Sequence, residues 1–524
     1  MKRFITIYLL VTIAGGVFIT SGMFYDMYNE PKFCLSIIAL LLLFILCCFG
    51  NGCIHKLQES LSSRLFTLGV LCLCLVLSVH AILQYTYVIP SHSFFRITGT
   101  FDNPSGYSLV QSILLPFSLQ LFIDKCENSF VKTLAVTTVF GALLTILLSG
   151  SRCGIMACCT SSSIILLMNE QASAKVRQHK GLTIACLLLI VAGCLALYFI
   201  KQDSADGRLL IWNVCLDMIA KRPLLGYGPD GFQTHYMDFQ AAYFEANPDY
   251  SYFMLADNVT HPFNEFVLVT VNYGIVGLLT AFCLTAILLV GIYKSVGKMS
   301  STWFAIVASL FVFCLFSYPF NYPQSWIFLL LSAVIAIPHK FISSVEQRTY
   351  LRYLLAVASF VLLCLTVKHA YLNMRWAEMS RRSIAGQTKR MLPHYKEMLP
   401  QMSDNPMFLY NYAAELNYVG SYEESLEMTK ACMERYNDYD VQILLADNLE
   451  NIGNMSSAVI AYSQALNMVP CRFVPMEGLL GIYQQMGDTI HADSIAYAIL
   501  QKPVKIQSFQ VDNIRAKAKS WLGR

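Results

Sequence analysis

Long apolar runs separated by short polar segments fill the chain from its N-terminus to about residue 372. A helix of about 20 apolar residues crosses the ~30 Å hydrocarbon layer of a bilayer. The first run lacks a small-residue cleavage site and another run follows directly, so we expect a span there rather than a cleaved signal peptide. The pattern predicts eleven transmembrane helices, at residues 4–24, 33–49, 65–86, 106–123, 130–148, 153–168, 181–200, 266–292, 302–320, 325–338 and 351–371.

After residue 372 the pattern changes, because charged residues occur throughout and no apolar run is long enough to span a membrane. Each unit of this tail is predicted to form a helix, a turn at a glycine, and a second helix with small residues that ends at a proline. The glycines recur after 33 and 34 residues and the prolines after 33, at Gly420, Gly453, Gly487, Pro470 and Pro503. Helix pairs with this period are typical of tetratricopeptide repeats, and an unrelated helical bundle is the alternative.

These patterns predict an all-α protein in two parts. Residues 1–372 are expected to form a polytopic transmembrane helix bundle with a large extracytoplasmic loop at 201–262. Residues 373–524 are expected to form a soluble helical repeat domain. Stacked repeats of this kind present concave surfaces, so a protein partner could bind there.

Composition and charge fit a protein of the lipid bilayer. Of 524 residues, 56% are hydrophobic and 13% are charged, whereas soluble domains carry about 25% charged residues. With the N-terminus in the cytoplasm, two Lys and Arg residues at the N-terminus and twelve in later cytoplasmic segments compare with seven outside. Cytoplasmic loops are enriched in Lys and Arg, so we expect this orientation, with the repeats outside the cytoplasm. The net charge of +4 follows this asymmetry and does not indicate nucleic acid binding.

The eighteen cysteines lie mostly within apolar spans, where Cys behaves as a small hydrophobic residue. Their spacing does not match a metal site. Cys432 and Cys471 fall in the region placed outside the cytoplasm, where a disulfide could form. We expect two packed thiols instead, since each stands alone on a predicted helix.

Four clusters of polar residues fall on the extracytoplasmic side of this topology, at residues 96–108, 147–154, 206–232 and 258–265. Three of them carry the arginines Arg96, Arg152, Arg208 and Arg222. Each arginine alone could be an interfacial anchor, and residues 206–222 could form an amphipathic helix that places Leu209, Trp212 and Leu216 on the membrane surface. Together they indicate an anionic ligand, because guanidinium groups bind phosphate through two hydrogen bonds and remain charged when partly desolvated.

The fourth cluster contains Asn258, His261, Asn264 and Glu265 ahead of an apolar run. If the helix begins near Pro262, these polar side chains gather around its N-terminus at spacings of three and four residues. They could simply cap the helix. The functional alternative is a general base with orienting partners, because His and Glu can take a proton from a sugar hydroxyl near neutral pH.

These residues resemble the motifs of the O-antigen ligase and O-antigen polymerase superfamily, which also contains bacterial protein O-oligosaccharyltransferases. The resemblance covers roughly residues 95–330. The matching motifs are a loop at 99–104 (Gly-Thr-Phe-Asp-Asn-Pro), a turn at 149–152 (Ser-Gly-Ser-Arg), a segment with Gly207, Arg208, Trp212, Arg222, Pro223, Gly226, Gly228, Pro229, Gly231 and Phe232, and a last motif with His261, Asn264, Gly274, Gly277 and Leu278. Many relatives have a histidine directly before the asparagine, where this chain has Phe263.

The resemblance implies a glycosyltransferase of the bacterial inner membrane that needs no metal or other cofactor. Its donor would be a glycan linked to polyprenyl diphosphate, and its acceptor a hydroxyl of lipid A core, a protein or a glycan. Arg152 and Arg208, with Arg222 and Arg96 in support, would bind the diphosphate. Asp102 and Asn103 would shape the acceptor or sugar side. His261 or Glu265 would act as the base, with Asn264 beside them.

Two other classes of protein remain open. A lipid-glycan flippase would also have many spans and buried arginines, but such transporters often contain an internal repeat of their membrane half, which this sequence does not show. A membrane-anchored repeat scaffold without chemistry would not need the polar cluster between residues 201 and 265.

The predicted topology can be tested with reporter fusions after residues 240 and 420. Both fusions are expected to report the non-cytoplasmic side, because the Lys and Arg asymmetry places the N-terminus inside. A cytoplasmic signal at 420 would mean an even number of spans, and it would remove the repeats from the acceptor side.

Overall fold

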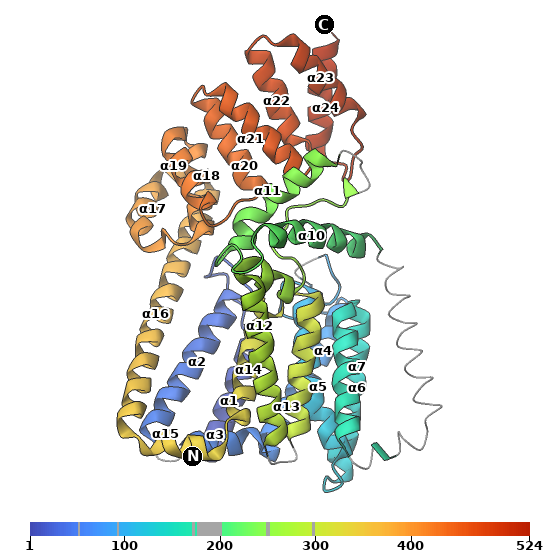
Figure 1. Ribbon diagram of the computed structural model, residues 1–524, viewed down its shortest axis with the longest axis vertical. Helices are drawn as coiled ribbons and strands as arrows, with labels where there is room; N and C mark the ends of the chain where they lie inside the picture. The colour runs from blue at the N-terminus through green and yellow to red at the C-terminus, as the bar shows by residue number, and fades with distance from the viewer. Residues whose placement is uncertain are drawn as a thin grey trace. The chain divides into compact units, whose positions relative to one another are not determined.

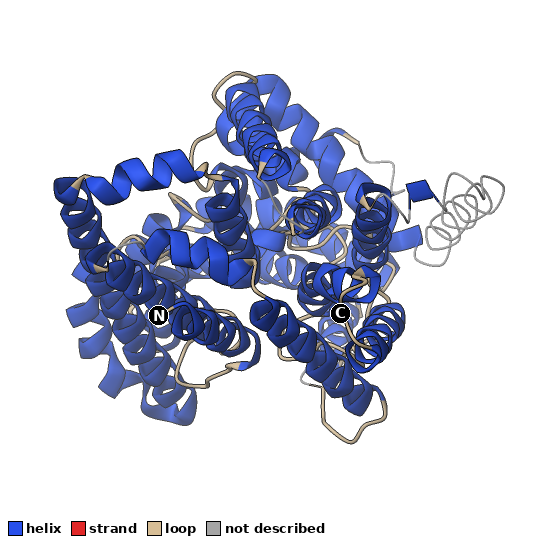
Figure 2. Ribbon diagram, turned by 90° about the horizontal axis from the view of Figure 1, so that it is seen from below, coloured by secondary structure: helices blue, strands red, loops and turns tan. Residues whose placement is uncertain are grey.

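The computed structural model describes residues 1–50, 53–91, 94–169, 173–174, 202–247, 252–295 and 299–523. Every regular element within these ranges is a helix (Figure 2), so the predicted all-α fold is confirmed. Helices occur at ten of the eleven predicted spans, and the span predicted at 181–200 lies outside the described residues.

The chain forms two compact units. The first comprises Met1–Leu197, Phe263–Glu265 and Thr280–Ala377. Its helices (Figure 1) are α1 (Lys2–Phe18), α2 (Glu30–Phe49), α3 (Cys53–Leu61), α4 (Arg64–Tyr85), α5 (Pro104–Ile123), α6 (Ser129–Ser149), α7 (Arg152–Met168), α13 (Ser300–Phe316), the 3₁₀ helix η2 (Pro319–Asn321), α14 (Pro323–Ala336), α15 (His339–Gln347) and most of α16 (Thr349–Arg382). The helix α12 (Glu265–Lys294) contributes to both units.

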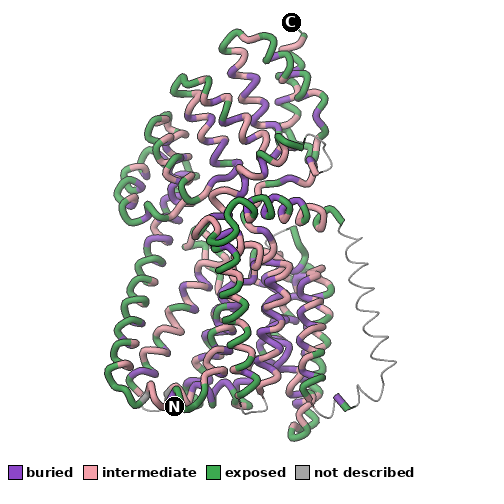
Figure 3. The backbone as a smooth tube through the Cα atoms, viewed as in Figure 1, coloured by how far each residue is buried: buried purple, intermediate pink, exposed green. Residues whose placement is uncertain are grey.

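Helix α5 is the centre of the first unit, packed among α4, α6, α7 and α13 and buried over most of its length (Figure 3). The ring of Phe117 on α5 makes edge contacts with Phe66 and Trp303, at centroid distances of 5.7 and 5.6 Å. By contrast, α16 exposes large apolar side chains, including Leu354 and Phe360. An exposed apolar surface along a whole helix is costly in water and fits contact with lipid.

Among the described residues, six helices are long and apolar enough to cross a membrane, or seven if the bent pair α14–α15 is one span. Helices α7 and α13 are apolar but shorter. The chain is therefore a multi-pass membrane protein, while the count of eleven spans stays a prediction. Two predicted spans, 4–24 and 302–320, extend beyond the ends of their helices, since α1 ends at Phe18 and α13 at Phe316. A proline at 319 follows the end of α13 within three residues.

The second unit comprises Tyr198–Pro262, Phe266–Leu279 and Glu378–Arg524. The predicted loop at 201–262 contains two helices, α10 (Gln202–Lys221) and α11 (Gly231–Ala246). The C-terminal helices are the π-type η3 (Ser383–Gln387), α17 (Thr388–Met402), α18 (Pro406–Tyr418), α19 (Tyr422–Met433), α20 (Tyr439–Asn451), α21 (Met455–Met468), α22 (Val474–Gln485), α23 (Thr489–Gln501) and α24 (Phe509–Leu522). Leu209 and Leu216 on α10 are exposed. Trp212, the third residue of the predicted membrane-facing stripe, is only partly exposed, and its indole donates to the backbone of Pro262.

The C-terminal helices form pairs with a glycine in each turn (Figure 1). Gly420, Gly453 and Gly487 join α18 to α19, α20 to α21 and α22 to α23, with φ of 86°, 87° and 70°. Glycine is favoured at positive φ because it has no Cβ, which explains their regular spacing. The predicted helix pairs are thus observed, and their assignment to the tetratricopeptide family stays a prediction.

Helix α11 packs on α21 and joins residues 201–262 to the helix pairs. The carboxylate of Asp238 on α11 accepts hydrogen bonds from Asn437 Nδ2 (3.1 Å) and Gln464 Nε2 (3.0 Å). Burial raises the pKa of Asp238, and these two amides oppose the shift. A buried carboxylate that loses its donors is destabilising, so this contact fixes α11 against the repeats.

Helix α12 is broken at Gly274, whose φ of 65° and ψ of −167° belong to a region that essentially only glycine occupies. At the break, backbone groups of α12 lose their hydrogen-bond partners within the helix. The turn after α10 provides replacement partners. The carbonyl oxygens of Val271 and Asn272 accept from the amides of Tyr227 (3.0 Å) and Gly228 (2.7 Å). We call these backbone bonds between residues 223–228 and 271–276 the helix-break contact.

The helix-break contact needs glycine on both sides. In the other direction, the amide of Ile275 donates to the carbonyl of Pro223 at 2.8 Å. A Cβ on Gly274 would lie 2.1 Å from the carbonyl oxygen of Leu224, and one on Gly226 would lie 2.5 Å from that of Val271. The glycines of two separate sequence motifs therefore serve one close approach of two backbones.

We expect Gly274→Ala to destabilise the protein by about 2 kcal/mol or more, because strain at such a φ/ψ alone costs ~1–3 kcal/mol and the new Cβ overlaps backbone atoms. Membrane accumulation and the thermal unfolding midpoint of the purified protein measure this. Gly481→Ala is the matched control: its Cβ would meet nothing within 4 Å, and alanine in a helix interior is neutral or stabilising. Equal unfolding midpoints for the two variants would contradict the role of the helix-break contact.

Candidate functional site

In the first unit, Asn103 begins α5 and connects it to the segment after α13. Its Oδ1 accepts from the amides of Ser105 (2.7 Å) and Gly106 (3.3 Å), which makes it the N-cap residue. Its Nδ2 donates to the hydroxyl of Tyr318 at 2.6 Å. The hydroxyls of Ser105 and Ser317 also lie 2.7 Å apart. Asn103 is thus a structural cap whose amide faces a tyrosine hydroxyl.

Arg152 is the first residue of α7, directly after its N-cap Ser151. The Ser151 hydroxyl accepts from the amide of Gly154 (3.3 Å) and from the hydroxyl of Ser108 on α5 (2.6 Å). A Cβ on Gly154 would lie 2.7 Å from the Cβ of Ser108, so the first turns of α5 and α7 pack closely. The predicted motifs at 99–104 and 149–152 are therefore brought together.

The charge of Arg152 is unusual for its position. Helix N-termini carry a partial positive charge that favours anions and disfavours cations. Two adjacent N-termini with a guanidinium at one of them produce a local positive potential, which is the arrangement that binds phosphate. This geometry supports the anionic-ligand prediction for Arg152.

The loop before α5 is held by polar side chains from two other helices. Lys32 of α2 is completely buried, and its Nζ donates to the carbonyl oxygens of Thr100 (2.7 Å) and Tyr28 (2.8 Å). Gln84 of α4 donates to the carbonyl of Gly99 (2.8 Å) and accepts from its amide (2.8 Å). Neither residue was predicted from the sequence, because a lone Lys or Gln at a helix end has no distinctive pattern.

Asp102 and Arg96 have different surroundings. The carboxylate of Asp102 accepts from Asn103 Nδ2 at 3.1 Å, so it belongs to the same cluster as Tyr318. Arg96 is exposed, and its guanidinium lies 5.6 Å from the ring centroids of Tyr85 and Tyr87. These ring contacts fit an aromatic anchor for Arg96.

The helix expected to begin near Pro262 begins at Glu265. Phe263 has a φ of +54°, a conformation incompatible with a continuing helix and rare for a bulky residue. His261, Asn264 and Glu265 therefore do not share one helical face, and that part of the prediction is wrong. Glu265 lies in the first unit with Asn264, whereas His261 lies in the second.

Phe263 and Glu265 both contact the segment after α13. The rings of Phe263 and Tyr318 make an edge contact with centroids 5.6 Å apart. Glu265 is buried, and the amide of Phe320 donates to its carboxylate. Residues 316–322 thus contact Asn103, Phe263 and Glu265, yet no charged residue or motif in this segment marked it in the sequence.

In the second unit, α10 connects Arg208 to the segment that carries His261. The indole Nε1 of Trp212 donates to the carbonyl of Pro262 at 2.9 Å. Arg208 precedes Trp212 by one helical turn and shares its face, so the Gly-Arg…Trp motif and the His261 motif meet. Arg208 lies in the second turn of α10, since the helix begins at Gln202 rather than near Arg208 as expected. Burial lowers the pKa of His261, which favours the neutral imidazole.

Arg222 lies in the turn that makes the helix-break contact. Its guanidinium is 4.8 Å from the ring centroid of Tyr227, whose ring also lies 5.1 Å from that of His235. Burial lowers the pKa of His235, and the charge of Arg222 contributes to this shift. Tyr227 and His235 were not predicted, because single aromatic residues in a loop are common.

The predicted residues thus form two groups. Arg96, Asp102, Asn103, Arg152, Asn264 and Glu265 belong to the first unit, and Arg208, Arg222 and His261 belong to the second. Within the described ranges, no group of three His, Cys, Asp or Glu side chains is arranged to hold a metal ion. The expectation of packed thiols is confirmed for Cys432 and Cys471, which are buried and unbridged.

Residues 137–282 match a family model described as O-antigen ligase. The matched segment contains Arg152, Arg208, Arg222, His261 and the broken part of α12, whereas the loop at 99–104 precedes it. No curated protein matches the chain.

Proposed function

We propose that this chain, which belongs to the O-antigen ligase superfamily through residues 137–282, transfers a glycan from a polyprenyl-diphosphate carrier to an acceptor hydroxyl. Lipid A core, a protein or a glycan could supply this hydroxyl. The reaction would take place on the extracytoplasmic face of a bacterial inner membrane, where the charge asymmetry places the polar clusters. The main structural support is the cationic N-terminus of α7 beside that of α5 in a membrane protein.

In the proposed reaction, the acceptor oxygen forms a bond to the anomeric carbon of the first sugar. The bond between that carbon and the phosphate oxygen breaks, and its electron pair leaves with the lipid diphosphate. The proton of the acceptor hydroxyl passes to a base on the protein. Atoms and charge balance without a further co-reactant.

Arg152 and Arg208 are assigned to the diphosphate. Negative charge grows on the leaving phosphate as the glycosidic bond breaks, and a fixed guanidinium stabilises that charge more than it stabilises the intact donor. One such contact accounts for ~10²–10³ in rate. Arg222 and Arg96 are assigned supporting roles, since both guanidinium groups already lie against tyrosine rings.

His261 is assigned as the base and Glu265 as the alternative. The lowered pKa of His261 keeps its imidazole neutral and able to accept a proton at neutral pH. Glu265 is the first residue of α12, where a carboxylate is stabilised by the helix dipole, and this position also explains it as a structural residue. Asn264 and Asn103, with Asp102, would orient the sugar or acceptor.

The proposed activity can be measured with purified protein in liposomes that contain a lipid-linked glycan and an acceptor. Wild-type protein is expected to transfer the glycan, while Arg208→Ala and Arg152→Ala should each lose ~10²–10³-fold in rate and still insert into the membrane. Arg208→Lys should restore little, because an ammonium cannot reproduce the two-pronged guanidinium contact.

Near-full activity of Arg208→Lys would exclude that contact and leave an interfacial anchor. Lipid translocation without transfer would identify a flippase, and capture of a partner without transfer would identify a scaffold.

The transfer rate is expected to fall in acid with a midpoint below the ordinary histidine pKa of ~6.5. The reason is that burial lowers the pKa of His261, so the imidazole stays neutral until the pH drops further. A pH–rate profile of the wild type measures this midpoint. His261→Ala should lose ~10²–10³-fold and also lose this acid limb, whereas Glu265→Gln should keep it. The reverse pattern would assign the base to Glu265.

A further inference from the structure

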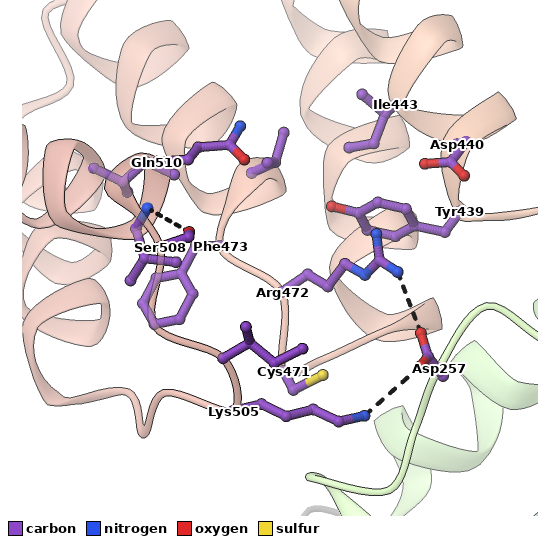
Figure 4. A pocket seen from close by; sticks show the side chains of 14 residues that line it. Asp257, Tyr439, Asp440, Ile443, Cys471, Arg472, Phe473, Lys505, Ser508 and Gln510 are labelled. Carbon is purple, nitrogen blue, oxygen red and sulfur yellow. Dashed lines mark hydrogen bonds and ion pairs between the residues drawn. The ribbon is translucent and has the colours of Figure 1, made fainter. Parts of the chain in front are cut away.

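The second unit contains a pocket of about 520 Å³ between the segment that carries Asp257 and the helices α20, α22 and α24 (Figure 4). This volume is within the range of sites that bury a small ligand. All of the lining residues belong to the second unit. The pocket is separate from the residues assigned to transfer, and neither the motifs nor the proposed chemistry accounts for it.

Charged side chains on the pocket wall neutralise one another. Asp257 lies 3.2 Å from Arg472 and 3.8 Å from Lys505. Asp440 supplies a second carboxylate, whose oxygen accepts from Asn258 Nδ2 at 3.2 Å. Two acids and two bases leave no net charge in the lining, so the pocket has no general attraction for an anion or a cation. Its charged groups are instead arranged as neighbouring donors and acceptors.

A buried hydroxyl at this pocket lacks a partner. Tyr439 is 3% exposed, and its hydroxyl has no hydrogen-bond partner among the described residues. Figure 4 shows this hydroxyl pointing into the space between Ile443 and Arg472. The Arg472 guanidinium lies over the ring at 4.8 Å from its centroid. A buried hydroxyl without a hydrogen bond costs ~1–3 kcal/mol, and a ligand hydroxyl would remove that cost.

Most of the remaining wall is apolar and includes Ile443, Val474, Val511 and Ile514, while Ser508 and Gln510 add two uncharged polar side chains. A lining that combines apolar side chains with carboxylates, a guanidinium and a tyrosine hydroxyl matches a sugar ring, which has C–H faces and hydroxyls that both donate and accept. A peptide carboxylate or an acidic sugar would instead meet the carboxylates of Asp257 and Asp440 without a surplus of cations.

We propose that this pocket binds a neutral mono- or disaccharide unit. Its identification as the acceptor end, which makes the acceptor a carbohydrate rather than a protein side chain, rests on the proposed transferase function.

Saturation-transfer NMR of the full-length protein in detergent tests the binding site. The probes are methyl glycosides of glucose, galactose, mannose and N-acetylglucosamine. Galacturonic acid and an acetylated Ala-Ser-Ala tripeptide are tested in the same way, as ligands of two other chemical classes. At least one neutral glycoside should bind, and Tyr439→Phe should weaken it about fivefold. That change removes one oxygen without a partner, so the thermal unfolding midpoint should not fall. Tyr497→Phe, which alters an exposed tyrosine outside the pocket, should bind like the wild type.

The proposal is overturned if no neutral glycoside binds, if Tyr439→Phe binds as well as the wild type, or if only galacturonic acid or the tripeptide depends on Tyr439. The liposome assay separates this result from the transferase function. Tyr439-dependent sugar binding without any glycan transfer would support the saccharide pocket and contradict the transferase function. Glycan transfer without sugar binding would support the transferase function and contradict the saccharide pocket.

Discussion

The arrangement of the second unit depends on the helix-break contact between residues 223–228 and 271–276. Backbone groups that lose their helical partners are expensive at a membrane boundary, because lipid offers no hydrogen bonds in exchange. The turn after α10 satisfies them, and it can do so only because Gly226 and Gly274 allow two backbones to approach without a Cβ between them. This contact fixes the turn that carries Arg222, and the Trp212–Pro262 hydrogen bond fixes α10 against the His261 segment. These two contacts set the positions, within the second unit, of the turn with Arg222 and of α10, which carries Arg208.

In the first unit, the polar residues of the candidate site lie at helix N-termini. Asn103 and Ser151 cap α5 and α7 with their own side chains, and the Ser108–Ser151 hydrogen bond holds the two termini together. Arg152 then adds a full positive charge where the helix dipole already supplies a partial one. The helix dipole alone would favour an acid or a small capping residue at that position. The proposed anionic ligand, polyprenyl diphosphate, would favour a cation there.

Features of the fold that depend on local rules could be predicted from the sequence. The apolar runs predicted ten helices that the structure contains. The regular spacing of glycines predicted the helix pairs, because Gly420, Gly453 and Gly487 each adopt positive φ. Features that depend on tertiary contacts could not be predicted. The start of α12 was predicted three residues too early, because the sequence does not indicate the positive φ of Phe263 that prevents a helix there. The segment 316–322 was missed because Tyr318 acquires its role only through contacts with Asn103 and Phe263, which are distant in sequence.

Phe263 also bears on how a base could work in this chain. A phenyl ring cannot accept a proton, and its edge contact with Tyr318 makes it a packing residue of the first unit. The chain passes from one compact unit to the other between Pro262 and Phe263, and a positive φ at a bulky residue costs ~1–3 kcal/mol unless the surroundings fix it. Replacing a histidine by phenylalanine here therefore exchanges a proton acceptor for an anchor of the irregular backbone. The imidazole that remains, His261, precedes Phe263 by two residues and belongs to the second unit.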